Sequence, residues 1–285
     1  MNTTTPSRSG EWLESWDPED ASSWDSRLAW RTLWITTFCL TLAFVAWFLP
    51  SAIIPKLNAL GYSFSTTQLY WMAAMPGLSA GLFRLVWMTL PPILGTRRMV
   101  SLTSLLLIAS TLGWGVRVQS PTAPYWELMT LAFLAGIGGG AFSGFMPSTS
   151  YFFPKAKQGT ALGIQAGLGN FGVSLVQLLT PYLIAVSFFA FLGDSQQLAV
   201  PGKPSKEVWY QNAAFVWIPL MVIGAALAWA LLKSVPVKAN VRQQFDIFNN
   251  TDTWLMTLLY IMTFGTFSGL AAQFGLLMSN LYGTG

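Results

Sequence analysis

The chain has 285 residues, of which 53% are hydrophobic and 9% are charged, and its formal net charge at pH 7 is +4. Soluble domains carry about 25% charged residues, so this composition excludes an ordinary soluble protein and indicates an integral membrane protein. The single cysteine, Cys39, and the absence of histidine exclude an intramolecular disulfide, a thiolate metal cluster and imidazole chemistry.

Residues 1–30 are acidic and rich in tryptophan, and they lack the basic start and the small-residue cleavage site of a signal peptide. Tryptophan is enriched where a protein meets the membrane interface. We therefore predict a cytoplasmic amino-terminal segment that lies at the interface. Its anchors would be Trp12, Trp16, Trp24 and Trp30.

About seven apolar stretches follow, each long enough for the roughly 20 residues that a helix needs to cross a bilayer core. They cover residues 31–55, 67–92, 99–118, 125–152, 159–192, 212–232 and 253–280. The sequence therefore predicts an all-α integral membrane protein. Residues 31–232 would form a six-helix transmembrane half, residues 233–252 a cytoplasmic linker, and residues 253–285 one further helix.

Lysine and arginine predict the orientation, because basic residues accumulate in short cytoplasmic loops. With the N-terminus inside, ten are cytoplasmic and four are external, and with Arg84 these account for all 15. The cytoplasmic set is Arg8, Arg27, Arg31, Arg97, Arg98, Lys155, Lys157, Lys233, Lys238 and Arg242; the external set is Lys56, Arg117, Lys203 and Lys206. The net positive charge thus reflects topology and gives no reason to infer nucleic-acid binding.

Glycine is concentrated from Gly136 to Gly172, across the junction of two apolar stretches. Gly159, Gly163 and Gly167 recur every fourth residue, so on a helix they form one stripe without side chains. Such a stripe lets the backbone of a neighbouring helix approach closely. We therefore predict a close helix contact along it, in a helix pair shaped around a small ligand.

Arg84 is the one basic residue predicted to lie deep in the membrane, about 20 Å from the cytoplasmic edge at 1.5 Å per helical residue. Arginine at mid-helix costs about 2.5 to 3.5 kcal/mol, so such residues usually face a partner or a water-filled path. The acidic residues all fall in tails, loops or helix ends. Arg84 would then bind a small oxyanion through its planar fork of donors, or it would bond backbone carbonyls or a missing segment.

Other candidates are individually weaker. Asn170 could donate its amide to an anion, although an interhelical hydrogen bond is an equal alternative. Phe142 and Phe264 could form the walls around a flat ligand, whereas aromatic residues at helical spacing are more often core. Tyr260 precedes Phe264 by four residues, so both project from one helix face.

Four motifs carry a resemblance to a known family. They are WDPEDASSW with AWRTL near the start, GLSAGLFR in the second stretch, GGGAFSGFMPSTSYFFPK in the fourth, and QGTALGIQAGLGNFGVSLVQ in the fifth. With these motifs the chain resembles the nitrate/nitrite porter family of the major facilitator superfamily, from about Trp16 to its end. The last two motifs together are the most specific.

The resemblance implies two six-helix halves with the substrate at the midplane between them, and alternating access by rocking. It implies that Arg84 binds the oxygens of nitrate or nitrite. Asn170 and the backbone around Ala166 and Gly167 match the nitrate-signature segment of the fifth span. Phe142, Tyr260 and Phe264 match residues that line or sandwich the planar anion.

The number of spans departs from the family pattern, which has about 12 spans and a second substrate arginine in the second half. The expectation is therefore the N-terminal half of the superfamily fold plus about one helix, in a truncated or split porter. Its function would be transport of nitrate or nitrite by exchange or proton-coupled uptake. The alternatives are a non-transporting fragment or subunit that requires a complementary chain, and a facilitator for another solute.

The expected partners are nitrate or nitrite, membrane lipid and a complementary second-half chain. The expected location is the inner (plasma) membrane, with several spans and a cytoplasmic N-terminus. No cofactor, metal or nucleic acid is expected. An enzyme is the least favoured class, because the sequence presents no nucleophile and base pair, metal-ligand set or cofactor loop.

Overall fold

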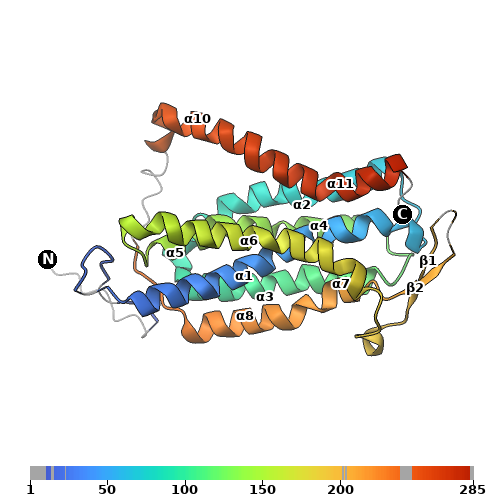
Figure 1. Cartoon of the computed structure of the whole chain (residues 1–285), viewed down its shortest axis with the longest axis horizontal. Coiled ribbons are helices and arrows are strands. Elements are labelled where there is room, and N and C mark those ends of the chain that lie inside the picture. Colours follow the sequence, from blue (N-terminus) through green and yellow to red (C-terminus); the bar gives the residue numbers. More distant parts are fainter. Residues whose placement is uncertain are drawn as a thin grey trace.

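The computed structural model describes residues 11–13, 16–22, 24–200, 202, 204–237 and 246–282. Helices pack lengthwise into an elongated bundle, with a small sheet at one end (Figure 1). The helices are α1 (Ser26–Ile53), α2 (Thr66–Trp87), α3 (Leu90–Arg117), α4 (Tyr125–Ala135), α5 (Ile137–Ser150), α6 (Lys155–Leu183), α7 (Asn212–Phe215), α8 (Trp217–Leu231), α10 (Thr251–Tyr260) and α11 (Thr266–Tyr282).

Shorter elements connect the helices. The 3-10 turns are η1 (Ile54–Lys56), η2 (Asn58–Leu60), η3 (Ala190–Leu192) and η4 (Asp246–Asn249), and a π-helical segment, η5 (Ile261–Gly265), joins α10 to α11. Strands β1 (Gln196–Leu198) and β2 (Lys206–Val208) pair antiparallel. These strands lie in the loop after α6, which begins earlier than the sequence predicted because α6 ends at Leu183.

Six helical segments of the described chain are long and apolar enough to cross a membrane. They are Ser26–Lys56, Leu90–Arg117, Tyr125–Ser150, Lys155–Leu183, Asn212–Leu231 and Thr251–Tyr282. The seventh predicted span corresponds to α2, which has 22 residues. α2 is not among these six segments. An all-α multi-pass membrane protein is confirmed.

The boundary between the second and third spans differs from the prediction. The second ends at Trp87, and Pro91 and Pro92 belong to the first turn of α3, where a missing N–H group is tolerated. Within α3, Gly95 has φ of 73°, a left-handed conformation that interrupts the helix. Proline and glycine therefore moved this boundary by several residues.

The bundle has an amino-terminal end, where α1 and α6 begin, and a hairpin end, which carries β1 and β2 (Figure 1). Basic residues of the two predicted sets lie at these two ends. Arg98 pairs with Glu11 at the amino-terminal end, and the hydroxyl of Tyr62 binds the carbonyl of Arg117 at the hairpin end. Four members of the predicted sets lie outside the described residues: Arg8, Lys203, Lys238 and Arg242.

Trp16 and Trp24 before α1, and Trp30 in its first turns, contact the segment between α5 and α6. The indole N–H of Trp16 donates to the carbonyl of Tyr151, and that of Trp24 donates to the carbonyl of Phe152, both at 2.9 Å. Trp30 meets the ring of Phe153 edge-on, with the two centroids 5.5 Å apart. These indole donors are used within the protein, and the position of the segment at the membrane interface stays a prediction.

The amino-terminal segment also ties α3 to the chain that follows α8. Glu11 accepts from Arg98 at 2.9 Å, and the backbone N–H of Leu13 donates to the carbonyl of Ser234 at 2.9 Å. A Cβ at Gly95 would lie 2.3 Å from the hydroxyl oxygen of Ser234, so only glycine fits this crossing. Three segments far apart in the sequence are thereby joined at the amino-terminal end.

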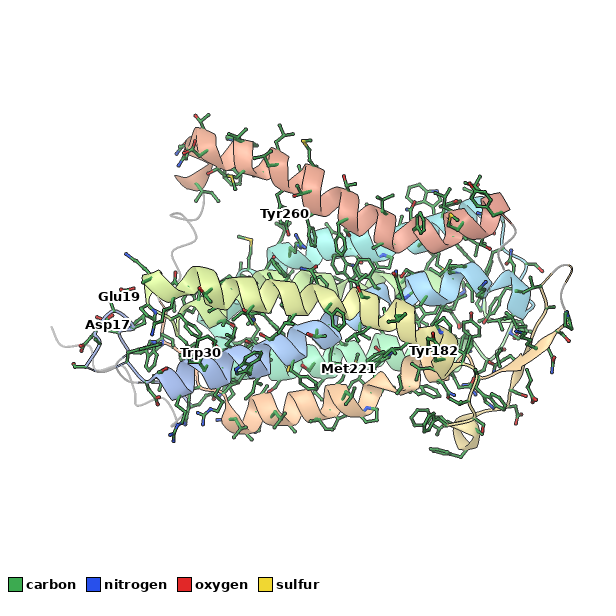
Figure 2. All side chains as sticks on the ribbon, viewed as in Figure 1. Asp17, Glu19, Trp30, Tyr182, Met221 and Tyr260 are labelled. Carbon is green, nitrogen blue, oxygen red and sulfur yellow. The ribbon has the colours of Figure 1, made fainter. Side chains whose placement is uncertain are left out.

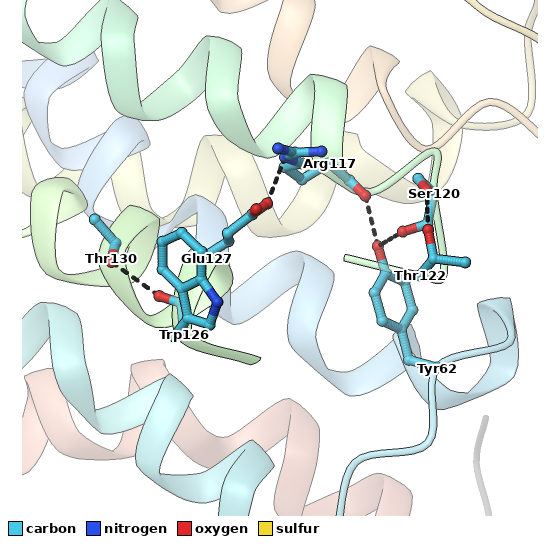
Figure 3. A network of polar contacts seen from close by, with 7 residues as sticks. All are labelled: Tyr62, Arg117, Ser120, Thr122, Trp126, Glu127 and Thr130. Atoms are coloured by element: carbon cyan, nitrogen blue, oxygen red, sulfur yellow. Dashed lines mark hydrogen bonds and ion pairs between the residues drawn. The ribbon is translucent and has the colours of Figure 1, made fainter. Parts of the chain in front are cut away.

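At the hairpin end, Tyr62 joins the α1–α2 connection to the end of α3 (Figure 3). Its hydroxyl donates to the carbonyls of Arg117 and Ser120, and the side chain of Arg117 pairs with Glu127 of α4 at 2.7 Å. Burial raises the pKa of Tyr62 to about 12 against a smaller opposing effect of Arg117, so the hydroxyl remains a donor at neutral pH.

Replacing Tyr62 with phenylalanine is expected to lower the free energy of unfolding by about 1 kcal/mol, because the carbonyls of Arg117 and Ser120 lose their shared donor. The wild-type contribution should be complete below pH 10 and should be lost as the pH rises toward about 12, because folding raises the pKa from 10.0. Thermal unfolding in detergent at pH 7 measures the effect. An equal loss in Tyr182→Phe, whose side chain is exposed, would contradict it.

Close packing of α1 against α5 and α6 depends on two glycines. A Cβ at Gly138 would lie 2.1 Å from the carbonyl oxygen of Ala43, and one at Gly172 would lie 2.2 Å from that of Thr41. Backbone atoms cannot move away as a flexible side chain can. The two glycines thus set the distance between these helices.

The predicted glycine stripe does not make the expected contact. A Cβ at Gly159, Gly163 or Gly167 would meet nothing within 4 Å in the described structure. The close contacts of α6 come from Gly169 and Gly172, which face α1. The prediction was wrong because the spacing of four residues identified a common face but not which face of α6 is packed.

Candidate anion-binding site

Arg84 projects from α2 toward the glycine-rich start of α5. Its Nε donates to the carbonyl of Gly139 at 3.4 Å. A Cβ at Gly139 would lie 2.6 Å from the Cβ of Ala80, and one at Gly140 would lie 2.5 Å from the Cβ of Phe83. Two consecutive glycines therefore bring the α5 backbone close enough to α2 for the guanidinium to reach it.

The guanidinium lies near two aromatic rings from different parts of the chain. The Cζ of Arg84 is 5.6 Å from the ring centroid of Phe142 on α5 and 5.3 Å from that of Phe264 in η5. The two ring centroids are 6.5 Å apart, with an angle of 31° between the ring planes. Each ring face attracts the cation, so the rings hold the guanidinium without neutralising it.

Tyr260 extends this group of rings. Its ring stacks on that of Phe264, with centroids 5.0 Å apart and planes 10° apart, as their spacing of four residues predicts. Tyr260 lies where the last helix diverges from the bundle (Figure 2). The structure thus brings together four of the predicted site residues: Arg84, Phe142, Tyr260 and Phe264.

The positive charge of Arg84 has no carboxylate partner in the described part of the chain. The ion pairs there join Arg98 to Glu11 and Arg117 to Glu127, near the two ends of the bundle. Arginine carries five N–H donors, and the hydrogen bond to Gly139 engages one of them. The alternative prediction, that Arg84 bonds backbone carbonyls, therefore holds for one N–H group. The other N–H groups of the guanidinium remain available to an anion.

The remaining predicted residues lie together on α6. The Nδ2 of Asn170 donates to the carbonyl of Ala166 at 2.8 Å, and its Oδ1 is buried without a hydrogen-bond partner. Gly167 is exposed. Among the described residues, no hydrogen bond or ring contact joins this group to Arg84. The α6 residues therefore form a second cluster, separate from the aromatic one.

The sequence did not reveal the π-helical segment that holds Phe264. η5 interrupts one continuous run of helix from Thr251 to Tyr282. Its Phe264 packs against the core, while Ile261 and Met262 are exposed. Single π-helical turns occur frequently at functional sites. No proline marks this turn, and Gly265, its last residue, is the one local signal that the sequence offered.

Trp47 on α1 is a further residue that the sequence analysis missed. Its indole N–H donates to the carbonyl of Pro76 at 2.9 Å. Its ring stacks with that of Phe264, with the two centroids 6.5 Å apart and the ring planes at 25°. Trp47 also meets Phe44 edge-on. A tryptophan in an apolar helix needs a partner for its N–H, and this need was the available signal.

Comparison with known proteins adds independent findings. Residues 36–285 match the model of the Major Facilitator Superfamily. The chain is 57% identical to the probable nitrate/nitrite antiporter NarK2 of Thermus thermophilus, over 97% of this chain and 63% of that protein. It is 39% identical to the nitrate/nitrite transporter NarU of Escherichia coli (strain K12), over 93% of this chain and 58% of that protein.

These findings confirm the resemblance drawn from the sequence motifs. The chain spans less than two thirds of the length of either relative. The matched part includes Arg84 and the helices that surround it.

Proposed function

Because the chain belongs to the major facilitator superfamily, we propose that it moves nitrate or nitrite across a membrane by alternating access. This assigns it to membrane transport and not to enzymes. The relatives named as nitrate/nitrite transporters support the substrate. The observation that carries the proposal is the guanidinium of Arg84, which lies near two aromatic rings and has no carboxylate partner among the described residues.

Nitrate and nitrite are planar anions, and this shape suits the arrangement. The N–H groups of Arg84 would donate to two oxygens at once, as a planar fork does with a carboxylate. Phe142 and Phe264 would cover the faces of the anion, since their rings are inclined by 31°. The hydroxyl of Tyr260 would supply a further donor from the same helix as Phe264. In this role the aromatic residues select for shape and Arg84 for charge.

The α6 cluster would contribute from a second side. Binding of the anion would release Nδ2 of Asn170 from the carbonyl of Ala166, 2.8 Å away, and turn it toward the substrate. The exposed backbone at Gly167 leaves room for this approach. This role for Asn170, Ala166 and Gly167 follows from the family resemblance and is supported by the exposed position of Gly167 on α6.

Exchange of one anion for another is favoured over proton-coupled uptake. The chain contains no histidine, and Glu127, in the first turn of α4, is engaged by Arg117. A proton relay through a membrane usually needs carboxylate or histidine side chains. Exchange needs only that the same Arg84 site bind nitrate on one face of the membrane and nitrite on the other.

We place the amino-terminal end of the bundle in the cytoplasm and the whole chain in the inner (plasma) membrane. By the sequence, ten of the lysine and arginine residues fall at this end and four at the hairpin end, which supports this orientation under the positive-inside rule. Residues 31–232 would then be the first transmembrane half, residues 233–252 the linker, and residues 253–285 the start of the second half. The longer relatives favour a second half, or a complementary chain, as the partner of the exposed helix α10.

Exchange in proteoliposomes tests the proposal. Vesicles that contain the chain and are loaded with nitrite should take up isotope-labelled nitrate in a saturable manner, and external sulfate should compete poorly because it is not planar. Protein-free vesicles provide the control. Saturable binding without exchange would favour the alternative of a fragment or subunit that needs a complementary chain. Equal uptake of nitrate and sulfate would favour a facilitator for another solute.

A further inference from the structure

The helix from Thr251 to Tyr282 is held at the hairpin end of the bundle and free at the other end (Figure 1). α11 packs against α1, α2 and η1, whereas the main contacts of α10 within the described residues are with its neighbours η4 and η5. Leu276 of α11 is 2% exposed, while Met256 of α10 is 63% exposed. The arrangement is therefore closed at the hairpin end and open at the amino-terminal end.

One polar side chain joins three helices at the closed end. Gln177 of α6 donates through Nε2 to the carbonyl of Ala271 on α11 at 2.7 Å, and to the hydroxyl of Ser51 on α1 at 2.9 Å. Ser51 in turn donates to the carbonyl of Phe48 at 2.7 Å. Both N–H groups of the amide are thereby used. The hydrogen bonds link α11 to two helices of the first half.

At Gly275, α11 leaves room for a Cβ at ordinary contact distance from α1 and η1. A Cβ at Gly275 would lie 3.6 Å from the Cγ of Pro55 and 3.9 Å from the carbonyl of Ser51. A cavity of about 460 Å³ lies beside the contact and reaches from Gln177 to Leu198 of β1. At the hairpin end, α11 therefore contacts the bundle beside this cavity, and the amide of Gln177 adds a specific hydrogen bond to the contact.

We propose that Gln177 is a positioning residue of transport, which holds the hairpin end closed by binding α11 to α1 and α6. This role depends on the proposed function in one respect, which is that alternating access moves the second half against the first. To open the hairpin end, α11 must leave α1 and α6, and the hydrogen bond from Gln177 to Ala271 must break. The bond from Gln177 to Ser51 joins α6 to α1 and orients the amide toward α11. Gln177 therefore favours the state in which the site opens toward the amino-terminal end.

Spin-label distances across the hairpin end test this role without any substrate. Labels at Tyr182→Cys on α6 and Leu281→Cys on α11 occupy exposed positions, and Cys39→Ser removes the native thiol. Gln177→Met keeps the side-chain length but removes both donors. It should shift the ratio of closed to open distances by about threefold to twentyfold toward open, the range expected for one interhelical hydrogen bond in a membrane protein.

Two further variants control the experiment. Gln158→Met makes the same substitution at the other end of α6, where Gln158 binds the carbonyls of Ser150 and Phe153, and should leave the distances unchanged. Ser51→Ala removes one acceptor and should give a smaller shift in the same direction, even if Gln177→Met does not fold. Unchanged distances in Gln177→Met, or in Ser51→Ala if Gln177→Met does not fold, would overturn the role of Gln177. Because no anion is present, this outcome is independent of nitrate binding.

Discussion

Replacing Arg84 with lysine is expected to weaken nitrate binding roughly tenfold to a hundredfold, although the positive charge is preserved. Lysine presents a compact ammonium group, which cannot donate to two oxygens of a planar anion in the fixed geometry of a guanidinium. It would also lose the stacking of a flat cation near Phe142 and Phe264, now 5.6 and 5.3 Å from the Cζ of Arg84. Isothermal titration of the purified chain in detergent measures the affinity.

Arg31→Lys provides the matched control for this prediction. Arg31 lies in α1 on an exposed face at the amino-terminal end, away from the aromatic rings around Arg84. The control should bind nitrate as the wild-type chain does. Unchanged affinity in Arg84→Lys would show that a point charge is sufficient, and would remove the proposed role of the planar fork.

The second large effect is expected from alanine at the glycines that face α1. In Gly138→Ala the new Cβ would lie 2.1 Å from the carbonyl oxygen of Ala43, and in Gly172→Ala it would lie 2.2 Å from that of Thr41. Overpacking of this kind costs about 1 to 3 kcal/mol, because the helix backbones must move apart. Each variant should therefore unfold at a lower temperature than the wild-type chain in detergent.

Gly163→Ala is the matched control on the same helix as Gly172. Its Cβ would meet nothing within 4 Å, and alanine is a better helix former than glycine by up to about 1 kcal/mol. This variant should be as stable as the wild-type chain or more stable. Equal destabilisation of Gly163→Ala and Gly172→Ala would mean that helix packing in solution differs from the packing described above.

Composition was sufficient to predict the fold class, and the reason is physical. A bilayer imposes long apolar helices, so the spans could be read from residue types alone. Their ends depend on local backbone chemistry. The start of α3 is shaped by two prolines in its first turn and by Gly95 within it, which the count of apolar residues ignores.

The candidate site was predicted in part. Arg84 stood out because a charge in the membrane is costly, and Tyr260 and Phe264 were paired correctly by helical spacing. The approach of Phe264 to Arg84 depends on how α11 packs on the bundle and on the π-helical turn, which are tertiary properties. For the same reason the sequence could not tell which glycine face of α6 is packed, and it selected Gly163 and Gly167 in place of Gly169 and Gly172.

A crystal structure of the chain grown with nitrate tests the central claim most directly. The account predicts planar density between the rings of Phe142 and Phe264, with two oxygens within hydrogen-bond distance of the guanidinium of Arg84. The same crystals of Arg84→Ala should lack this density. Nitrate bound elsewhere, or the same density in Arg84→Ala, would contradict an anion site built on Arg84.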